Sequence, residues 1–245
     1  KFVSNFLLTQ RIFYVNIMLK GEVKMPKDVD IKLRPVYDFT PKEGIMPINQ
    51  QDKYALLPWG EIDGKDLIIF IDVNAFIMVK RHARKRVDRE VGGFLVGEAL
   101  CEKENFFIQI TDIIDVKEIQ HKSAEFIFTH DVWKMIDGLM SEHHQDKQLL
   151  GWYHTHPGIG IFLSPEDKFI QNNFFNHSWQ TALVLDPLTQ HQGFYHLKND
   201  KLVGLGFYVY TYRENTQVLK RLMRELEVAE KREKCGRYRA HHILS

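Results

Sequence analysis

The sequence predicts a mixed fold of the α/β or α+β class, in which a sheet and helices pack as a sandwich. Short apolar runs typical of strands alternate with segments of helical periodicity between residues 66 and 232. Three of the strand-like runs follow one another without a helix between them, which is typical of adjacent antiparallel strands. The 245 residues, 44% of them hydrophobic, suffice for one domain with a full core plus extensions.

The expected elements can be given in chain order. They are a buried strand over 66–72, an amphipathic helix over 74–86, strands over 90–97 and 106–116, a helix over 131–144, a strand over 148–156, a helix over 165–175, strands over 181–185, 193–197 and 203–211, and a closing helix over 213–232. The single domain is expected over 65–211, between an N-terminal extension and arm over 1–64 and a C-terminal helix and tail over 212–245.

The N-terminal segment is expected to lie outside the domain. Polar residues interrupt its first 24 residues, so no span of about 20 apolar residues exists. We interpret these residues as a mis-called start or a poorly ordered extension, with a weak secretory or membrane signal as the alternative. Five prolines between residues 26 and 64 favour an extended arm that lies on the domain.

Charge and cysteine content limit the classes of function. A formal net charge of +1 gives no general attraction to nucleic acid or anionic membranes, so neither is expected as a partner. Cys101 and Cys235 are too few for a disulfide framework, and the protein is predicted to be cytoplasmic with reduced thiols. The basic run over 80–86 is interpreted as a solvated helix end rather than a binding patch, because no aromatic residues are interleaved with it.

The stretch from Gly151 to Asp167 carries the most chemistry. His154 and His156 project from the same side of an extended strand, because side chains alternate along a strand. Pro157 ends that strand, and Ser164 begins a helix that has an acid, Asp167, three residues after the serine. Two neutral imidazoles and a carboxylate suffice to hold one catalytic zinc ion with a fourth position for water.

Simpler interpretations of this stretch exist. A His-x-His pair is common without a metal, and an acid in the first helical turn is favoured by the helix dipole alone. The whole combination, with Pro157 and Ser164 at fixed offsets, is hard to explain by packing. Thr155 is expected to face away from the two histidines and to pack against or orient them. Trp152 is a core residue or a wall of the metal pocket.

The order His-x-His-Pro, six residues, Ser, two residues, Asp resembles the JAMM (MPN+) motif of the JAB/Mov34/PAD-1 zinc metalloproteases, which include deubiquitinase-type isopeptidases. Gly-Trp-Tyr before the motif and Gly-x-Gly within it are similar to the eukaryotic isopeptidases, although we expect a prokaryotic member. The resemblance covers residues 67–210. It implies a curved central sheet flanked by helices.

The resemblance also implies a role for each site residue. His154, His156 and Asp167 correspond to the zinc ligands, and Ser164 to a serine that stabilises the oxyanion of the intermediate. In the family the general acid/base opens a strand of the form Glu-x-x-Gly-x-x-x-Gly, which matches Glu90 here. Two other acids are weaker candidates: Glu98 is interpreted as a solvated turn residue, and Glu166 points away from Asp167 by helix geometry.

The implied activity is zinc-dependent hydrolysis of amide or isopeptide bonds at the C-terminus of ubiquitin-like modifiers, through a zinc-activated water. The partner is then a protein substrate. One alternative is a non-catalytic MPN scaffold that binds proteins, although such members have usually lost the ligand set. Another is a JAB peptidase that acts on a non-modifier substrate. The short connection after Asp186-Pro187 makes linkage specificity doubtful, and residues 117–124 are predicted to grip the substrate tail.

Overall fold

The computed structural model describes residues 40–64, 67–116, 130–198 and 201–224, all within one compact unit that spans residues 38–245. The predictions for residues 1–39, for the substrate-gripping segment 117–124 and for the end of the closing helix therefore lie outside the described residues. Within the described ranges, none of the helices has the length and apolar character needed to span a bilayer.

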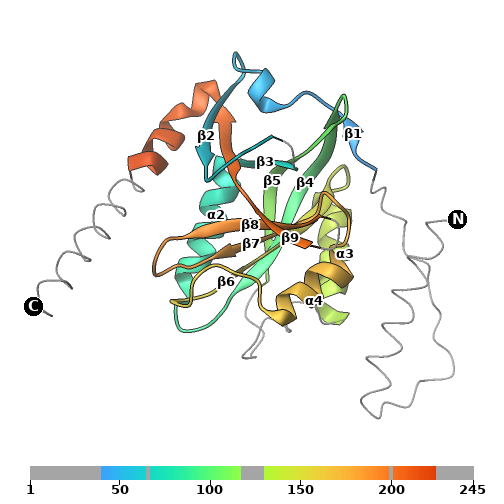
Figure 1. Cartoon of the computed structure of the whole chain (residues 1–245), viewed down its shortest axis with the longest axis vertical. Coiled ribbons are helices and arrows are strands. Elements are labelled where there is room, and N and C mark those ends of the chain that lie inside the picture. Colours follow the sequence, from blue (N-terminus) through green and yellow to red (C-terminus); the bar gives the residue numbers. More distant parts are fainter. Residues whose placement is uncertain (1–39, 65–66, 117–129, 199–200, 225–245) are drawn as a thin grey trace, which may run out of the picture. The chain divides into compact units, whose positions relative to one another are not determined.

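A 10-stranded sheet forms the centre of the part of the chain that the structure describes (Figure 1). Its strands are β1 (Lys42–Glu43), β2 (Tyr54–Trp59), β3 (Ile68–Asp72), β4 (Gly92–Glu102), β5 (Asn105–Asp115), β6 (Gln148–Thr155), β7 (Thr181–Leu185), β8 (Gln192–Lys198), β9 (Lys201–Leu205) and β10 (Phe207–Tyr212). The strands lie in the order β2-β10-β3-β5-β4-β6-β7-β8-β9, and β1 pairs with β4. Parallel and antiparallel pairs both occur.

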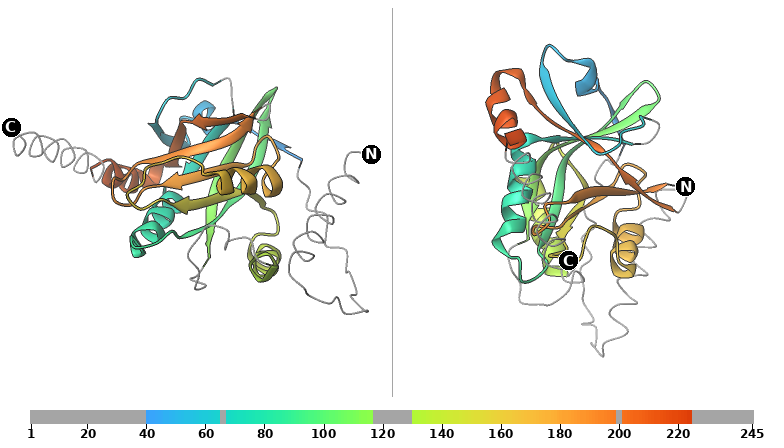
Figure 2. Two further views of the ribbon diagram at one scale, coloured as in Figure 1. Left: turned by 60° about the horizontal axis from the view of Figure 1, so that its bottom comes forward. Right: turned by 60° about the vertical axis from the view of Figure 1, so that its left-hand side comes forward.

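Helices cover both faces of this curved sheet (Figure 2). They are α2 (Val73–Lys85), α3 (His130–His143) and α4 (Pro165–Phe174), together with the short 3₁₀ helices η1 (Pro47–Asn49) and η3 (Arg213–Asn215) and a helix over 216–224. The α2 helix packs across β3, β5, β6 and β10. The predicted α/β class, with a curved central sheet flanked by helices, is confirmed.

Strand β6 separates two layers of the core because its side chains alternate. Tyr153 belongs to the apolar cluster on the α2 side, and its hydroxyl lies 2.8 Å from His82 Nδ1 of α2. Leu150 joins the same cluster because the β4–β6 register is irregular between Leu149 and Gly151, which interrupts the alternation there. Trp152 faces the other way, where its ring lies 6.2 Å from Phe175 at the end of α4. His154 and His156 share this second face.

The predicted strand over 203–211 is wrong in one respect, since the structure divides it into β9 and β10. Between these strands the Gly206 N–H donates to the Glu61 carbonyl at 3.0 Å. A Cβ atom at this position would overlap the same carbonyl oxygen, so the close approach requires glycine. The chain thus leaves the β8 edge and crosses to pair with β2 and β3.

The proline-containing arm contributes to the sheet where it is described. Strand β2 pairs with β10 in antiparallel register, and Gly44 N donates to Cys101 O beside β1. Pro58 lies in β2, an edge strand of the sheet, which is where prolines within strands are typically found. Residues 40–64 therefore join the sheet at two places, with β2 at its edge and β1 beside the end of β4.

The basic run at the end of α2 is not simply a solvated helix end. Lys80 is buried with its ammonium group 5.5 Å from the Phe76 ring and 5.8 Å from the Trp59 ring, distances typical of cation–π contacts. His82 is buried as well. The interpretation of a solvated patch is wrong for these two residues, because α2 turns one side of its last turns toward the sheet.

Candidate metal centre

The end of β6 places both motif histidines in the interior. His154 is fully buried and His156 is 3% exposed. Parallel pairing with β7 reaches Thr155, and the His156 N–H donates to Leu185 O at 2.8 Å one step beyond the strand. Pro157 then ends the pairing. Main-chain hydrogen bonds therefore hold the backbone of both histidines in place against β7.

The start of α4 fixes the carboxylate of Asp167. Ser164 is the N-cap: its Oγ accepts from Asp167 N at 3.1 Å, and its own N–H donates to Asp167 Oδ2 at 2.8 Å. This reciprocal capping box satisfies two N–H groups that have no partner inside the helix. Pro165 in the first turn favours the helical φ angle. Asp167 is 1% exposed, so the cap points its carboxylate inward.

These three side chains converge on one point. His154 Nε2 lies 3.0 Å from His156 Nε2, and Asp167 Oδ2 lies 3.4 Å and 3.6 Å from these two nitrogens. A tetrahedral zinc ion with bonds of about 2.0–2.1 Å requires ligand atoms about 3.3–3.4 Å apart. The separations therefore fit one face of such a site. Among the described residues, this is the group of His, Cys, Asp and Glu side chains close enough to hold a metal.

Contacts around the site orient both rings. His156 Nδ1 lies 3.3 Å from Gly160 O, so a proton on Nδ1 leaves Nε2 unprotonated toward Asp167. The indole of Trp152 stacks on His154 with ring centres 4.5 Å apart, and Trp152 Nε1 donates to Gln171 Oε1 of α4 at 2.9 Å. Both interpretations of Trp152 therefore hold, since it is a buried core residue and a wall of the site.

The charges of the site are coupled. Burial alone would raise the pKa of the Asp167 carboxyl, but the neighbouring imidazoles of His154 and His156 hold that pKa far below its usual value. Burial would lower the pKa of His156, but Asp167 and Glu90 raise it. Asp167 Oδ1 and His154 Nδ1 are buried with no hydrogen-bond partner among the described residues. Two imidazoles and a carboxylate, buried with few hydrogen-bond partners, are chemically suited to bind a divalent cation.

Glu90 is the acid beside this group. It stands two residues before β4, and its Oε1 lies 3.7 Å from His156 Nε2. Its side chain is 31% exposed, and partial burial raises the pKa of its carboxyl. Glu98 lies inside β4 rather than after it, and pairs with Lys147 at 3.3 Å. Glu166 is exposed. The structure thus brings Glu90 to the site, and its catalytic role stays a prediction.

Two glycines in the Glu-x-x-Gly-x-x-x-Gly pattern allow neighbouring strands to approach β4 closely. A Cβ atom at Gly93 would overlap Ile114 O and lie 2.8 Å from the Tyr153 hydroxyl. One at Gly97 would overlap Gln109 O, beside an irregularity in the β4–β5 register between Val96 and Gly97. The two glycines therefore mark positions where the backbones of neighbouring strands come close to β4.

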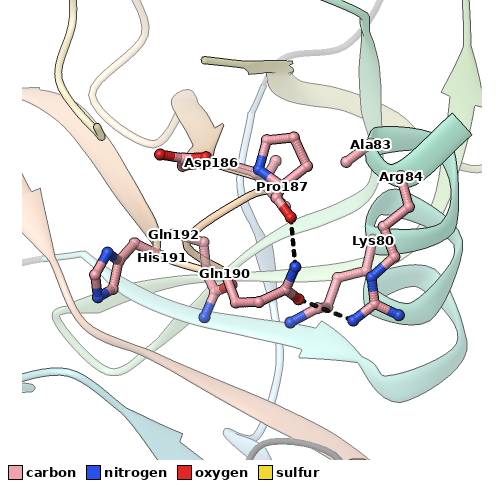
Figure 3. A pocket seen from close by; sticks show the side chains of 9 residues that line it. Lys80, Ala83, Arg84, Asp186, Pro187, Gln190, His191 and Gln192 are labelled. Carbon is pink, nitrogen blue, oxygen red and sulfur yellow. Dashed lines mark hydrogen bonds between the residues drawn. The ribbon is translucent and has the colours of Figure 1, made fainter. Parts of the chain in front are cut away.

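Asp186 is a residue near the site that sequence reasoning did not single out. Its Oδ1 accepts from Gly158 N at 3.0 Å, and from the backbone N–H groups of Leu188 and Thr189 at 2.9 Å and 3.3 Å. A small pocket lies on the other side of this turn, beside Lys80 and Arg84 of α2 (Figure 3). The Asp-Pro pair directly after a buried strand could have indicated a carboxylate that accepts hydrogen bonds from the backbone of the turn.

Comparison with known proteins gives the same assignment for the domain. Residues 67–177 match the model of the family described as JAB1/Mov34/MPN/PAD-1 ubiquitin protease. Ubiquitin carboxyl-terminal hydrolase RPN11 of Saccharomyces cerevisiae is 25% identical over 67% of this chain and 53% of its own length. The 26S proteasome non-ATPase regulatory subunit 14 of Dictyostelium discoideum is 33% identical over 51% of this chain and 40% of its own.

Among solved structures, protein DSY2949 from Desulfitobacterium hafniense matches with a TM-score of 0.43 and 17% identity, over 56% of this chain and 89% of that chain. The chain spans about half of the length of the curated relatives named above, or less. The family match covers β3 to α4, the segment that contains Glu90, both histidines, Ser164 and Asp167. The segment over residues 67–177 is therefore similar to the JAB1/Mov34/MPN/PAD-1 ubiquitin proteases.

Proposed function

We propose that this protein is a zinc-dependent metallopeptidase that hydrolyses amide or isopeptide bonds at the C-terminus of ubiquitin-like modifiers. The observation that carries the proposal is the convergence of His154, His156 and Asp167 within 3.6 Å of one another, with Glu90 beside them. The names of the relatives, a ubiquitin carboxyl-terminal hydrolase and a proteasome subunit, support a ubiquitin-related substrate.

In this proposal His154, His156 and Asp167 hold one zinc ion. Zinc bound there would supply a Lewis acid that lowers the pKa of water from about 15.7 toward about 7. Glu90, the partly exposed carboxylate, would accept a proton from the attacking water at Oε1 and deliver it to the leaving amine. The raised pKa of Glu90 suits it to exchanging protons nearer neutral pH than an ordinary carboxylate.

Ser164 takes the second catalytic role in the proposal. Its Oγ accepts from Asp167 N within the capping box, and a hydroxyl that accepts one bond still has its hydrogen to donate. That hydrogen would be directed to the oxyanion that develops on the substrate carbonyl. Removal of one such donor typically lowers the rate about 100- to 1,000-fold.

Exposed apolar side chains near the candidate site support a protein substrate. Ile159 is 59% exposed and Phe162 44% exposed, and the Phe162 ring centre lies 4.7 Å from that of His156. Leu188, in the turn after β7, is also 59% exposed and lies against Gly158 in the loop that carries Ile159 and Phe162. A cluster of exposed apolar side chains is typical of a contact surface for another protein. The proposal does not include specificity for one type of ubiquitin-chain linkage, because the turn between β7 and β8 is short. The proposal does include a cytoplasmic location, because the 245 residues contain only two cysteines.

The proposal is tested by cleavage of ubiquitin whose C-terminal glycine is joined by an isopeptide bond to a fluorescent lysine peptide. Fusions of other ubiquitin-like modifiers are run in parallel. We expect zinc-dependent cleavage that a chelator abolishes, that Glu90→Gln abolishes, and that the matched variant Glu98→Gln retains. Equal rates for wild type and Glu90→Gln would rule out the proposed acid/base.

The two alternatives predict different outcomes of this experiment. A non-catalytic scaffold would bind the modifiers without cleaving any of them at full zinc occupancy. A peptidase for other substrates would cleave unfolded peptides and leave every modifier fusion intact. Retention of all five expected site residues favours the enzyme over the scaffold.

A further inference from the structure

Thr155 stands between the two histidines but faces away from them. It is fully buried, and the alternation of β6 places its side chain on the side of Tyr153 rather than the side of His154. Its contacts are with the segment that precedes β4. The Val91 N–H donates to Thr155 Oγ1 at 2.9 Å, and the Thr155 N–H donates to Val91 O at 2.9 Å. Val91 directly follows Glu90 in the chain.

This pair of bonds departs from an ordinary antiparallel ladder. Gly92 pairs with His154, so Val91 lies opposite Thr155 at the next step. Two opposed residues in a hydrogen-bonded position normally exchange both bonds through their main chains. Here the Thr155 hydroxyl oxygen accepts one of the two bonds. The side chain therefore fixes the separation of the two segments at the point where Glu90 leaves the sheet.

We propose that Thr155 is a positioning residue for Glu90. Its hydroxyl holds the main chain of Val91, and thereby holds the Glu90 carboxylate 3.7 Å from His156 Nε2. This inference rests on the proposed function, because it concerns the acid/base of that reaction. One dipeptide, Thr155-His156, then carries both a candidate metal ligand and the group that places the acid/base.

The side-chain chemistry indicates which substitutions separate this role from packing. Serine keeps the acceptor oxygen, whereas valine keeps the shape of threonine and removes it. In Thr155→Val the part-buried Val91 N–H loses its acceptor and shifts toward a main-chain oxygen. Glu90 moves with it. A misplacement of about 1 Å of a catalytic group can lower the rate about 100-fold.

The test compares zinc-loaded wild type, Thr155→Val and Thr155→Ser on the fluorescent ubiquitin isopeptide. We expect kcat to fall about 10- to 100-fold in the valine variant with KM changed by less than about two-fold, and serine to restore most of the rate. Zinc affinity, measured by chelator competition, and the visible spectrum of the cobalt-substituted protein should be unchanged in both variants. A loss of zinc affinity parallel to the loss of kcat, or a serine variant as slow as the valine variant, would overturn the inference.

Crystal structures of the three proteins test the same point without turnover. We expect the Glu90 carboxylate to be displaced from His156 in Thr155→Val and to keep its wild-type place in Thr155→Ser. If wild type cleaves no modifier, the proposed function fails, and these structures still decide whether Thr155 positions Glu90. An undisplaced Glu90 in the valine variant contradicts the inference. Thr155→Ala, which also lacks the hydroxyl, replaces the valine variant if that variant does not fold.

Discussion

At the scale of single residues, the candidate site depends on which nitrogen of each histidine faces Asp167. In both rings it is Nε2, and Gly160 O faces the other nitrogen of His156. The alternation of a strand predicts that the two side chains share a face, but not which nitrogen points inward. For His156 that orientation comes from the loop after Pro157, whose path the sequence alone does not determine.

Removal of one histidine should abolish tight zinc binding. We expect His156→Ala to weaken zinc affinity by more than about 100-fold, beyond the about 10- to 100-fold typical for loss of an outer-shell partner. Competition with a chromogenic chelator measures it. His143→Ala, at an exposed histidine of α3, is the matched control and should bind zinc like wild type. Zinc retained by His156→Ala would show that the ligand assignment is wrong.

Asp186 carries a residue-scale prediction about pH. Burial would raise the pKa of its carboxyl, but the N–H groups of Gly158, Leu188 and Thr189 donate to it and hold its pKa below the usual 3.8. A folded-state pKa below the unfolded value stabilises the fold fully above pH 3.8. The stabilisation is lost as the pH falls through the folded-state pKa.

Asp186→Asn keeps the acceptor oxygen but removes the charge and this pH dependence. We expect the variant to have a smaller free energy of unfolding than wild type at pH 7, since bonds to a charged acceptor are stronger. The difference should be constant above about pH 5 and narrow below about pH 4. Urea titrations of both proteins at a series of pH values from about 7 down to about 3 measure it. A difference that does not change with pH would contradict the assigned role of the carboxylate.

At the scale of elements, the motif strand and α4 are predictable because their signals are local. Pro157 ends β6, and the Ser164–Asp167 capping box begins α4 where the sequence indicates. The division of β9 from β10 is not predictable in this way. It depends on the contact of Gly206 with Glu61, residues far apart in the chain. The bond between Thr155 and Val91 likewise depends on the register of two strands that no local pattern specifies.

The docking of α4 on β6 gives the prediction at this scale. Gln171 is fully buried and uses its amide three times, as acceptor for Trp152 Nε1 and as donor to Phe175 O and Gln180 O. It lies one helical turn after Asp167, and Trp152 lies two residues before His154. The Gln171–Trp152 bond therefore ties together the same two elements that the candidate metal ligands occupy.

Gln171→Met should weaken both the fold and the site. We expect the free energy of unfolding to fall by about 2–3 kcal/mol, because buried partners of the amide lose their hydrogen bonds. Zinc affinity should fall as well, since α4 no longer holds Asp167 in place. Denaturant titrations and chelator competition measure the two effects. Asn172→Met, at an exposed position of the same helix, should change neither.

At the scale of the whole molecule, the candidate site joins segments that lie far apart in the sequence. Glu90 precedes β4, the histidines end β6 and Asp167 begins α4. Local patterns predict that each of these elements exists. The order in which the strands lie follows from long-range pairing, such as that of β10 between β2 and β3. The curved sheet is predicted from the family resemblance and not from local patterns.

Zinc should therefore stabilise the entire fold, because a metal held by β6 and α4 binds the native state and not the separated segments. Binding adds about 4 kcal/mol to the free energy of unfolding when free zinc exceeds the dissociation constant about 1,000-fold. We expect the Tm of wild type to rise with zinc concentration and to fall on addition of a chelator. The Tm of Asp167→Ala should not respond, whereas Glu90→Gln should respond like wild type, since Glu90 is not a proposed ligand. An equal zinc response in wild type and Asp167→Ala would show that the stabilising metal binds elsewhere.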